Sequence, residues 1–395
     1  MEGGGRASWV KYGPLVSLFV LFLAIWYRSP DRGVLDDRLD TVLSSLLRAE
    51  RKVGINDVAR PKVAIGFGGC VDLIVDAVSL LSKIGITPAD QPLHHDVIDS
   101  AEQLSQSFAY FFAPGAAAEY IVHSDDHNPY LASMEEFAKK LQDFDPDLLV
   151  VGGLQMMDNF PFQSGERGAL LSRLAEVLVS SSPTIGVHFE MASFVEESIM
   201  EDLLYYVIPH ADSLGMNEQE LPNLLSLLKG SNITVLSDPN PRVATVLDQM
   251  REVYRLVNQR YKDASAQADD AHAWSKPLTR LHVHTLAFQA MIVTRGSQWK
   301  NTMSATAKAS LTANRHVCGS NDIDPSKARL IMDDSFSVSR REGSQRIALQ
   351  ESRPVSCWEE DDYEICVAPV LVCTEVYQTA GGGDNISAAG LVLQI

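Results

Sequence analysis

The strongest constraint on the fold is a regular alternation of amphipathic helices with short, continuously apolar strands, which begins at Met134. We predict helices at 134–143, 168–181 and 194–206, and strands at 147–152, 184–190 and 213–216. Short strands without a polar face are typical of a parallel sheet covered by helices on both sides. The sequence therefore predicts an α/β fold with a central, mostly parallel sheet flanked by helices.

The pattern is less regular outside this region. We predict a first strand at 62–67, helices at 73–84, 98–112 and 242–261, strands at 280–285, 290–294 and 363–373, and β-hairpins between 318 and 360. At about 100–200 residues per domain, 395 residues allow two domains or one large one. We predict a single domain over 61–395, preceded by a polar linker at 29–60.

An apolar run at residues 15–27 follows two basic residues near the N-terminus. Thirteen residues are short for a membrane span but suit the hydrophobic stretch of a secretory signal. No clear small-x-small cleavage site follows, so residues 1–28 are interpreted as a signal peptide or an uncleaved anchor, with a buried core helix as the third alternative. Both secretory interpretations predict the lumen of the endoplasmic reticulum, membrane anchoring through residues 15–27, or secretion.

Charge and cysteine content exclude other classes of protein. The net charge of −18 argues against a dedicated nucleic-acid binder, because an acidic surface repels polyphosphate backbones. The five cysteines are irregularly spaced, so they predict neither a disulfide scaffold nor a zinc site, and their odd number leaves at least one thiol unpaired.

The sharpest chemical signal is a glycine cluster, Gly381, Gly382 and Gly383, followed by Asp384 between a predicted strand and a helix. Glycines let the backbone approach a ligand closely, and the N–H groups at a helix start bind anions. An Asp there can take a proton from a hydroxyl while the site holds a phosphoryl group. The alternative is a glycine-rich turn with Asp384 as a helix cap.

Two carboxylates support the phosphoryl-transfer interpretation. Glu190 ends one predicted strand and Glu220 follows the next, and ligand sites of open α/β sheets gather at the carboxyl ends of strands. Carboxylate oxygens suit Mg²⁺, which keeps several of its waters. With the glycine cluster, these residues predict a metal–phosphate site.

The chain from about Lys62 onward resembles the ADP-dependent sugar kinases of the ribokinase-like superfamily, and within them the ADP-dependent glucokinases. The matching segments are 115–119, 146–154, 156–157, 187–190, 213–220, 280–285, 369–373 and 381–384. The resemblance implies a ribokinase-like fold and the transfer of a phosphoryl group from ADP to the 6-hydroxyl of D-glucose, giving AMP and glucose 6-phosphate.

The resemblance also implies roles for individual residues. Asp384 would be the catalytic base, and Glu190 and Glu220 would organise Mg²⁺ together with Asp384. The remaining implied contacts are Gly381, Gly382 and Gly383 with the phosphoryl group, His284 with the nucleotide, and Asp72 and Glu119 with glucose hydroxyls.

The chain departs from the family in the lid region. Gly68 to Asp72 lacks the family's Asn, and Tyr120 follows Glu119 where the family carries a long segment with a sugar-binding motif and much of the lid. We interpret this as an internal deletion that leaves a lid remnant at about 66–125. Since positioning of the substrate supplies much of a catalytic effect, we expect an intact nucleotide-and-metal half with impaired affinity for glucose.

Two alternatives stay open. The chain is either a catalytic, monomeric sugar kinase that uses ADP and Mg²⁺, or a non-catalytic relative that binds nucleotide and has lost its sugar site. A kinase acting on fructose 6-phosphate ranks last, because no Arg/Lys cluster accompanies Asp72 or Glu119.

Overall fold

The structure is a computed structural model of the whole chain. It describes residues 31–52, 63–67, 73–76, 107–111, 119–123, 129–181, 183–194, 196–231, 238, 240–266, 274–379 and 381–395. The apolar run at 15–27 and Asp72 lie outside these residues, so the predictions about them stay predictions. Among the described helices, none combines the length and the apolar character that crossing a bilayer requires.

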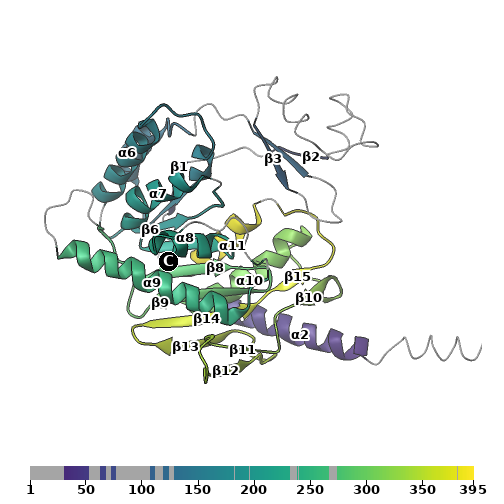
Figure 1. Cartoon of the computed structure of the whole chain (residues 1–395). Helices are drawn as coiled ribbons and strands as arrows, with labels where there is room; N and C mark the ends of the chain where they lie inside the picture. The colour runs from purple at the N-terminus through teal and green to yellow at the C-terminus, as the bar shows by residue number, and fades with distance from the viewer. Residues whose placement is uncertain are drawn as a thin grey trace, which may run out of the picture.

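The centre of the molecule is an eight-stranded sheet in the order β1-β5-β6-β7-β8-β9-β14-β13 (Figure 1). In that order the strands are Val63–Phe67, Leu148–Gly152, Gly186–Glu190, Ser213–Asn217, Arg280–His284, Phe288–Thr294, Tyr363–Pro369 and Ser356–Glu360. The strands from β1 to β8 pair in parallel, whereas β8, β9, β14 and β13 pair antiparallel. The predicted mostly parallel sheet is therefore confirmed.

Helices cover both faces of this sheet, as predicted. One face packs against α5 (Met134–Phe144), α6 (Glu166–Ser180), α7 (Glu197–Tyr206), α8 (Glu220–Leu228) and α9 (Val243–Ser265). The other face packs against α2 (Asp31–Glu50), α10 (Thr302–Cys318) and α11 (Gly382–Val392). Alternate residues of β14 pack into the hydrophobic cores on the two faces of the sheet. Ile365 packs on the face covered by α5 to α9, and Cys366 packs on the face covered by α2 and α10. The strands are apolar on both faces because both faces are covered.

Helix α2 corrects the prediction of a polar linker at 29–60. Its residues Val42 and Leu46 are fully buried and pack against Ala307 and Leu311 of α10. The apolar residues recur at helical spacing, which makes one buried stripe on a segment whose average composition is polar.

Two predicted helices are corrected in the parts that the structure describes. The described part of 73–84 is the strand β2 (Leu73–Asp76), and the described part of 98–112 is β3 (Ser107–Phe111). Both pair with β4 (Glu119–His123) in a separate antiparallel sheet of order β2-β4-β3. A short apolar run suits either structure when judged by periodicity alone. The interpretation of 66–125 as a lid remnant stays a prediction.

The predicted hairpin region contains two short antiparallel pairs. β11 (Ser335–Ser337) pairs with β12 (Arg346–Ala348), and β10 (Ala328–Leu330) pairs with β15 (Leu371–Cys373). The strand predicted at 363–373 is divided at Val370 into β14 and β15, which belong to different sheets.

Four of the five cysteines form disulfides, which the irregular spacing did not predict. Cys318 at the end of α10 is bonded to Cys373 of β15, and Cys357 of β13 is bonded to Cys366 of β14. Cys70 lies outside the described residues. The expectation of an unpaired thiol therefore rests on Cys70.

Removing the first disulfide is expected to cost more stability than removing the second. The Cys318–Cys373 bond spans 55 residues and the Cys357–Cys366 bond spans 9, and a longer loop loses more entropy on cross-linking. We expect the double variant Cys318→Ser/Cys373→Ser to lose about 2–4 kcal/mol of unfolding free energy. Urea denaturation measures this loss. The matched control, Cys357→Ser/Cys366→Ser, should lose less, and an equal or larger loss would contradict the expectation.

Candidate active site

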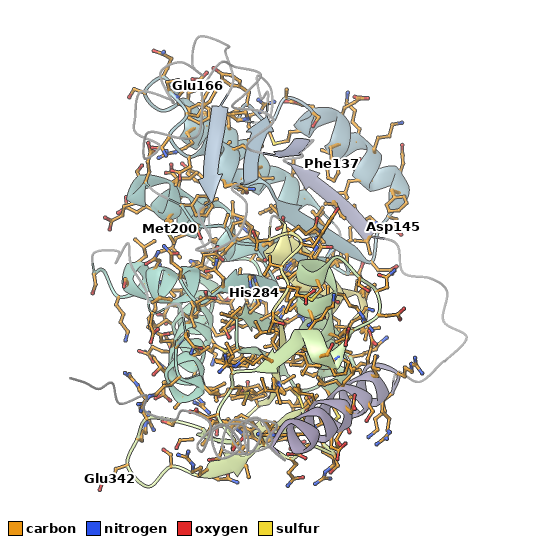
Figure 2. The ribbon with its side chains drawn as sticks, turned by 90° about the vertical axis from the view of Figure 1, so that its right-hand side faces the viewer. Phe137, Asp145, Glu166, Met200, His284 and Glu342 are labelled. Atoms are coloured by element: carbon orange, nitrogen blue, oxygen red, sulfur yellow. A yellow bond between two sulfur atoms is a disulfide. The ribbon has the colours of Figure 1, made fainter. Side chains whose placement is uncertain are left out.

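Glu190, the last residue of β6, is the centre of a buried polar cluster. Its Oε2 accepts a hydrogen bond from Nε2 of His188 at 3.0 Å, and its Oε1 accepts one from Oγ of Ser387 at 2.8 Å. Nε2 of His284, at the end of β8, lies 3.6 Å from the same Oε1. Figure 2 shows His284 near the middle of the molecule. The ends of β6 and β8 and the first turns of α11 therefore meet at one carboxylate.

A row of polar side chains continues this cluster across three neighbouring strands. His188 of β6 is in register with Ser213 of β7, and Ser213 is in register with Arg280 of β8. Nδ1 of His188 lies 2.8 Å from Oγ of Ser213, and Nη1 of Arg280 donates to the same Oγ at 3.0 Å. Nε of Arg280 donates to Oε1 of Gln394 at 2.6 Å.

The donors in this row allow one arrangement of protons. An ionised Glu190 only accepts, so Nε2 of His188 carries the proton, and Nδ1 accepts from the hydroxyl of Ser213, which itself accepts from the guanidinium of Arg280. Burial lowers the pKa of His188, so the ring is neutral and carries its single proton on Nε2. His188 therefore donates to Glu190. Arg280 is fully buried and donates to the same hydroxyl of Ser213 that holds Nδ1 of His188.

Glu190 is ionised in this environment. Burial alone would raise its pKa, but the hydrogen bond from His188 and the nearby imidazole of His284 outweigh burial and hold the pKa far below its usual range. Burial alone would likewise lower the pKa of His284, yet the hydrogen bond to Glu190 and the nearby charges of Glu190, Glu220 and Glu218 raise it. The surrounding carboxylates thus favour the protonated form of His284 at the carboxyl edge of the sheet.

Glu220 is buried at the first turn of α8. Its Oε1 accepts hydrogen bonds from Nδ2 of Asn217 at 2.8 Å and from Oγ of Ser193 at 3.1 Å, and its Oε2 accepts one from the backbone N–H of Asn217 at 2.9 Å. Burial nevertheless raises the pKa of Glu220 to about 7, opposed chiefly by the charge of His284. A further cation beside Glu220 would favour its ionised form.

The glycine cluster forms the start of α11, as predicted. Gly381 caps the helix with φ of 70°, a left-handed conformation that glycine adopts without strain. A Cβ atom on Gly383 would come within 3.2 Å of Cε1 of His284, so the imidazole ring would have to move by a few tenths of an ångström. Asp384 lies in the first turn of the helix and is exposed. The N-terminal end of α11, which favours anions, thus lies next to His284.

One cavity joins these groups. It has a volume of about 500 Å³, and Asp384, Ser387, Glu190 and His188 line it together with the backbone of Gly152 and Gly153. The remaining wall is largely apolar. The size suits a small organic ligand. The predicted base and the predicted metal carboxylate Glu190 therefore face the same space.

The chain has recognisable relatives. The sequence model described as "ADP-specific Phosphofructokinase/Glucokinase conserved region" matches residues 61–122 and 119–393. The chain belongs to the ADP-specific phosphofructokinase/glucokinase family. The two matched segments of the family meet at 119–122, which is where the sequence departs from the family pattern and where we interpret an internal deletion.

The chain is similar to two ADP-dependent glucokinases. It is 33% identical over 280 residues to the ADP-dependent glucokinase of Bos taurus, a match that covers 70% of this chain and 53% of that protein. It is 27% identical over 282 residues to the probable ADP-dependent glucokinase of Caenorhabditis elegans, with coverages of 70% and 54%. The chain therefore spans about half the length of the curated relatives it matches.

The comparison with solved structures includes a phosphofructokinase from Pyrococcus horikoshii OT3 solved with AMP. It is 14% identical, with a TM-score of 0.47, and the match covers 73% of this chain and 63% of that chain.

The structure brings some of the predicted site residues together and does not describe the side chains of others. It brings together Glu190, Glu220, His284 and the start of α11 with Asp384. Glu119 begins β4, but its side chain, like all of Asp72, lies outside the described residues. The predicted glucose contacts of these two residues stay predictions.

Several residues of the cluster were not predicted as site residues, among them Ser387, Ser213 and Arg280. Ser387 lies one turn after Asp384, so helical spacing from the predicted base could have found it. Ser213 and Arg280 take part through strand register, which carries no signal in a single sequence.

Gly215 of β7 lies directly beside the carboxylate of Glu190. Replacing Gly215 with Ala is expected to displace this carboxylate and to lower kcat about 10²-fold, the usual effect of moving a group of the active site by about 1 Å. A Cβ atom there would overlap Oε2 of Glu190 and lie 2.9 Å from its Cδ and 3.0 Å from Cε1 of His188. Steady-state kinetics and a thermal melt measure the effect. The control is Gly168→Ala in α6, whose Cβ would lie at an ordinary 3.6 Å from Oη of Tyr206. Unchanged kcat for Gly215→Ala would show that Glu190 is not needed where it lies.

Proposed function

We propose that the chain transfers the β-phosphoryl group of ADP to a sugar hydroxyl, with D-glucose as the acceptor and AMP and glucose 6-phosphate as the products. The observation that carries the proposal is the shared cavity of Asp384 and Glu190 at the start of α11. Membership of the ADP-specific phosphofructokinase/glucokinase family supports ADP as the donor.

Asp384 acts as the general base in this proposal. Its carboxylate takes the proton of the 6-hydroxyl as that oxygen forms its bond to the β-phosphorus, while the bond from the β-phosphorus to the bridging oxygen breaks and AMP leaves. The backbone N–H groups of the first turn of α11 stabilise the charge on the phosphoryl oxygens. Glycines at 381–383 leave room for this close approach.

Glu190 and Glu220 are the residues that would hold Mg²⁺. A carboxylate offers about four acceptor positions. The structure shows three donors around each of these two carboxylates, so each keeps an acceptor position that a metal ion could use. The raised pKa of Glu220 is the second indication, because a buried carboxyl with so high a pKa lacks cationic compensation. Bound Mg²⁺ would supply neutralisation of phosphate charge. His188 and Ser387 keep the Glu190 carboxylate in place.

Glucose is favoured over fructose 6-phosphate by the cavity wall. A substrate with its own phosphate requires basic side chains, and neither Lys nor Arg belongs to the described residues that line this cavity. The similarity to two glucokinases points the same way.

A coupled assay for sugar phosphate tests the proposal by exchanging donor and acceptor. We expect turnover with ADP and glucose in the presence of Mg²⁺, little with ATP, little with fructose 6-phosphate, and loss of turnover when EDTA removes the metal. Turnover with ATP alone, or with fructose 6-phosphate alone, would contradict the stated specificity.

A non-catalytic nucleotide binder is the second candidate, and the length of the chain favours it. The chain spans about half of the relatives' length, and the predicted deletion removes sugar-binding sequence. Isothermal titration distinguishes the two candidates: AMP binding with no glucose binding and no turnover supports the binder. Glucose binding weaker than that of the full-length relatives, but with turnover, supports the kinase with a shortened lid.

We also propose that the chain acts in the secretory pathway as a monomer. The two disulfides support this location, because such bonds persist in oxidising compartments and are rare in the cytosol. The apolar run at 15–27 supports it independently as a signal peptide or a membrane anchor. Protease protection of the chain in microsomes tests the location.

A further inference from the structure

A second cavity lies far from the proposed active site, between the end of α2 and the edge of the sheet. Its volume is about 530 Å³, within the range of small-molecule sites. The last turns of α2, the β12 strand and the segment from Gln350 to Trp358 form its walls. Met303 near the start of α10 also lines it, whereas His316 near the end of α10 lies by Gly382 of the active site. The length of α10 thus separates the two sites by about 20 Å.

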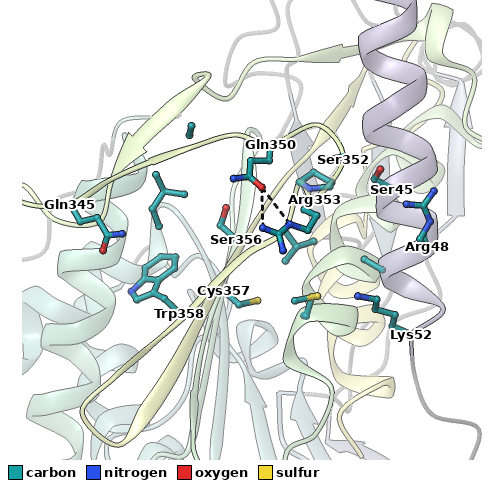
Figure 3. A pocket seen from close by; sticks show the side chains of 16 residues that line it. Ser45, Arg48, Lys52, Gln345, Gln350, Ser352, Arg353, Ser356, Cys357 and Trp358 are labelled. Atoms are coloured by element: carbon teal, nitrogen blue, oxygen red, sulfur yellow. Dashed lines mark hydrogen bonds between the residues drawn. The ribbon is translucent and has the colours of Figure 1, made fainter.

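The lining of this cavity is cationic in a strongly acidic protein. Arg48, Lys52 and Arg353 line it, and neither Asp nor Glu belongs to its described lining. Figure 3 shows Arg48 and Lys52 on the α2 side, Trp358 on the opposite side, and Arg353 between them. At a net charge of −18, a described lining that holds three cations and no carboxylate is an unusual local feature.

Three of the neighbouring carboxylates are held by other basic residues, whereas Glu364 lies with Lys52 in the adjoining hollow and within 4.8 Å of Cys357. The pairs are Glu50 with Arg315 and Lys308, Glu351 with Arg38, and Glu360 with Arg251. Among the described residues, Arg48 and Lys52 form no ion pair, and the guanidinium of Arg353 makes only long hydrogen bonds, of 3.3 and 3.4 Å, to Oε1 of Gln350. The negative end of the α2 dipole accounts for one basic residue in its last turn. It does not account for cations from two separate segments.

The other groups in the cavity suit the organic part of a ligand. The indole of Trp358 is held by its Nε1, which donates to Glu360 at 2.6 Å, and it packs near Phe336 with ring centroids 6.3 Å apart. Ile347 and Val355 add apolar surface. An aromatic ring beside clustered cations favours, as a ligand, a molecule with a planar or apolar group and a phosphate.

We propose that this cavity is a binding site for a small organic phosphate of the nucleoside monophosphate kind, with the phosphate held by Arg48, Lys52 and Arg353 and the organic group placed against Trp358. The site is separate from the proposed catalytic cavity and does not depend on the catalytic assignment.

The test uses the full chain labelled with 5-fluorotryptophan and followed by ¹⁹F NMR, with Trp358→Phe to assign the resonance. We expect AMP and, more weakly, inorganic phosphate to shift the Trp358 resonance, while neutral adenosine does not. The resonances of Trp274 and Trp299 report on the rest of the fold. No shift of Trp358 with AMP or phosphate at millimolar concentrations would overturn the proposal, as would an equal shift with adenosine.

Charge removal gives the second arm of the test. Arg48→Gln/Arg353→Gln is expected to weaken AMP binding at Trp358 at least about tenfold, since hydrogen bonds to charged groups contribute about 1.5–3 kcal/mol each. The matched control, Arg329→Gln/Arg341→Gln, removes the same charge from exposed positions outside the cavity and should leave the affinity unchanged. Equal affinities in both double variants would contradict the proposal. Calorimetry distinguishes AMP bound in this cavity from AMP bound at the catalytic site. The number of AMP molecules bound per chain should fall by one in Arg48→Gln/Arg353→Gln, whether or not the catalytic site also binds AMP.

Discussion

Replacing Asp384 with Asn is expected to lower kcat for glucose phosphorylation by about 10²–10⁴-fold, the usual contribution of a positioned general base. The amide keeps the shape of the side chain but cannot accept the proton of the hydroxyl. Because the start of α11 and the cluster around Glu190 are unchanged, nucleotide binding should persist. Steady-state kinetics and calorimetry with AMP measure the two quantities separately.

The control is Asp333→Asn, which makes the same chemical change at an exposed position outside the cavity. It should leave kcat unchanged. If Asp384→Asn retained full turnover, Asp384 would not be the general base, and another group would have to act in that role.

Replacing Phe189 with Ala is expected to lower the unfolding free energy by about 3–5 kcal/mol, the cost of removing a buried aromatic side chain. Phe189 is fully buried in the central strand β6, between His188 and Glu190 in sequence. Side chains alternate along a strand, so Phe189 packs into the helix-covered core on the side away from its two polar neighbours. Denaturation by urea measures the loss.

Phe144→Ala is the matched control, because Phe144 ends α5 with 45% of its surface exposed. Its loss should be within about 1 kcal/mol, as for most exposed positions. Comparable losses at the two positions would contradict the central place of β6 in the core.

The sheet was predictable because its strands are apolar on both faces. Leu148–Gly152 and Ser213–Asn217 lie in the parallel sheet close to the predicted ranges. The polar average of residues 29–60 hid the buried stripe of α2, which depends on the spacing of a few residues such as Val42 and Leu46. β2 and β3 were mistaken for helices because short apolar runs suit both structures and only pairing with β4 decides between them.

The site was predictable as far as topology determines it. Glu190 and Glu220 could be placed together because parallel strands end at a common edge, and the start of α11 followed from the glycines. The row from Arg280 through Ser213 to His188 could not be predicted, since it depends on the register of three strands. The predicted contacts of Asp72 and Glu119 stay predictions.

The most direct test of the central claim is ³¹P NMR of the intact protein incubated with ADP, glucose and Mg²⁺. The account predicts that the β-phosphate signal of ADP is replaced by equal amounts of AMP and glucose 6-phosphate, and that neither product accumulates with Asp384→Asn. Persistence of the ADP signals, or release of inorganic phosphate in place of glucose 6-phosphate, would contradict the assignment of the cavity at Asp384 and Glu190 to phosphoryl transfer.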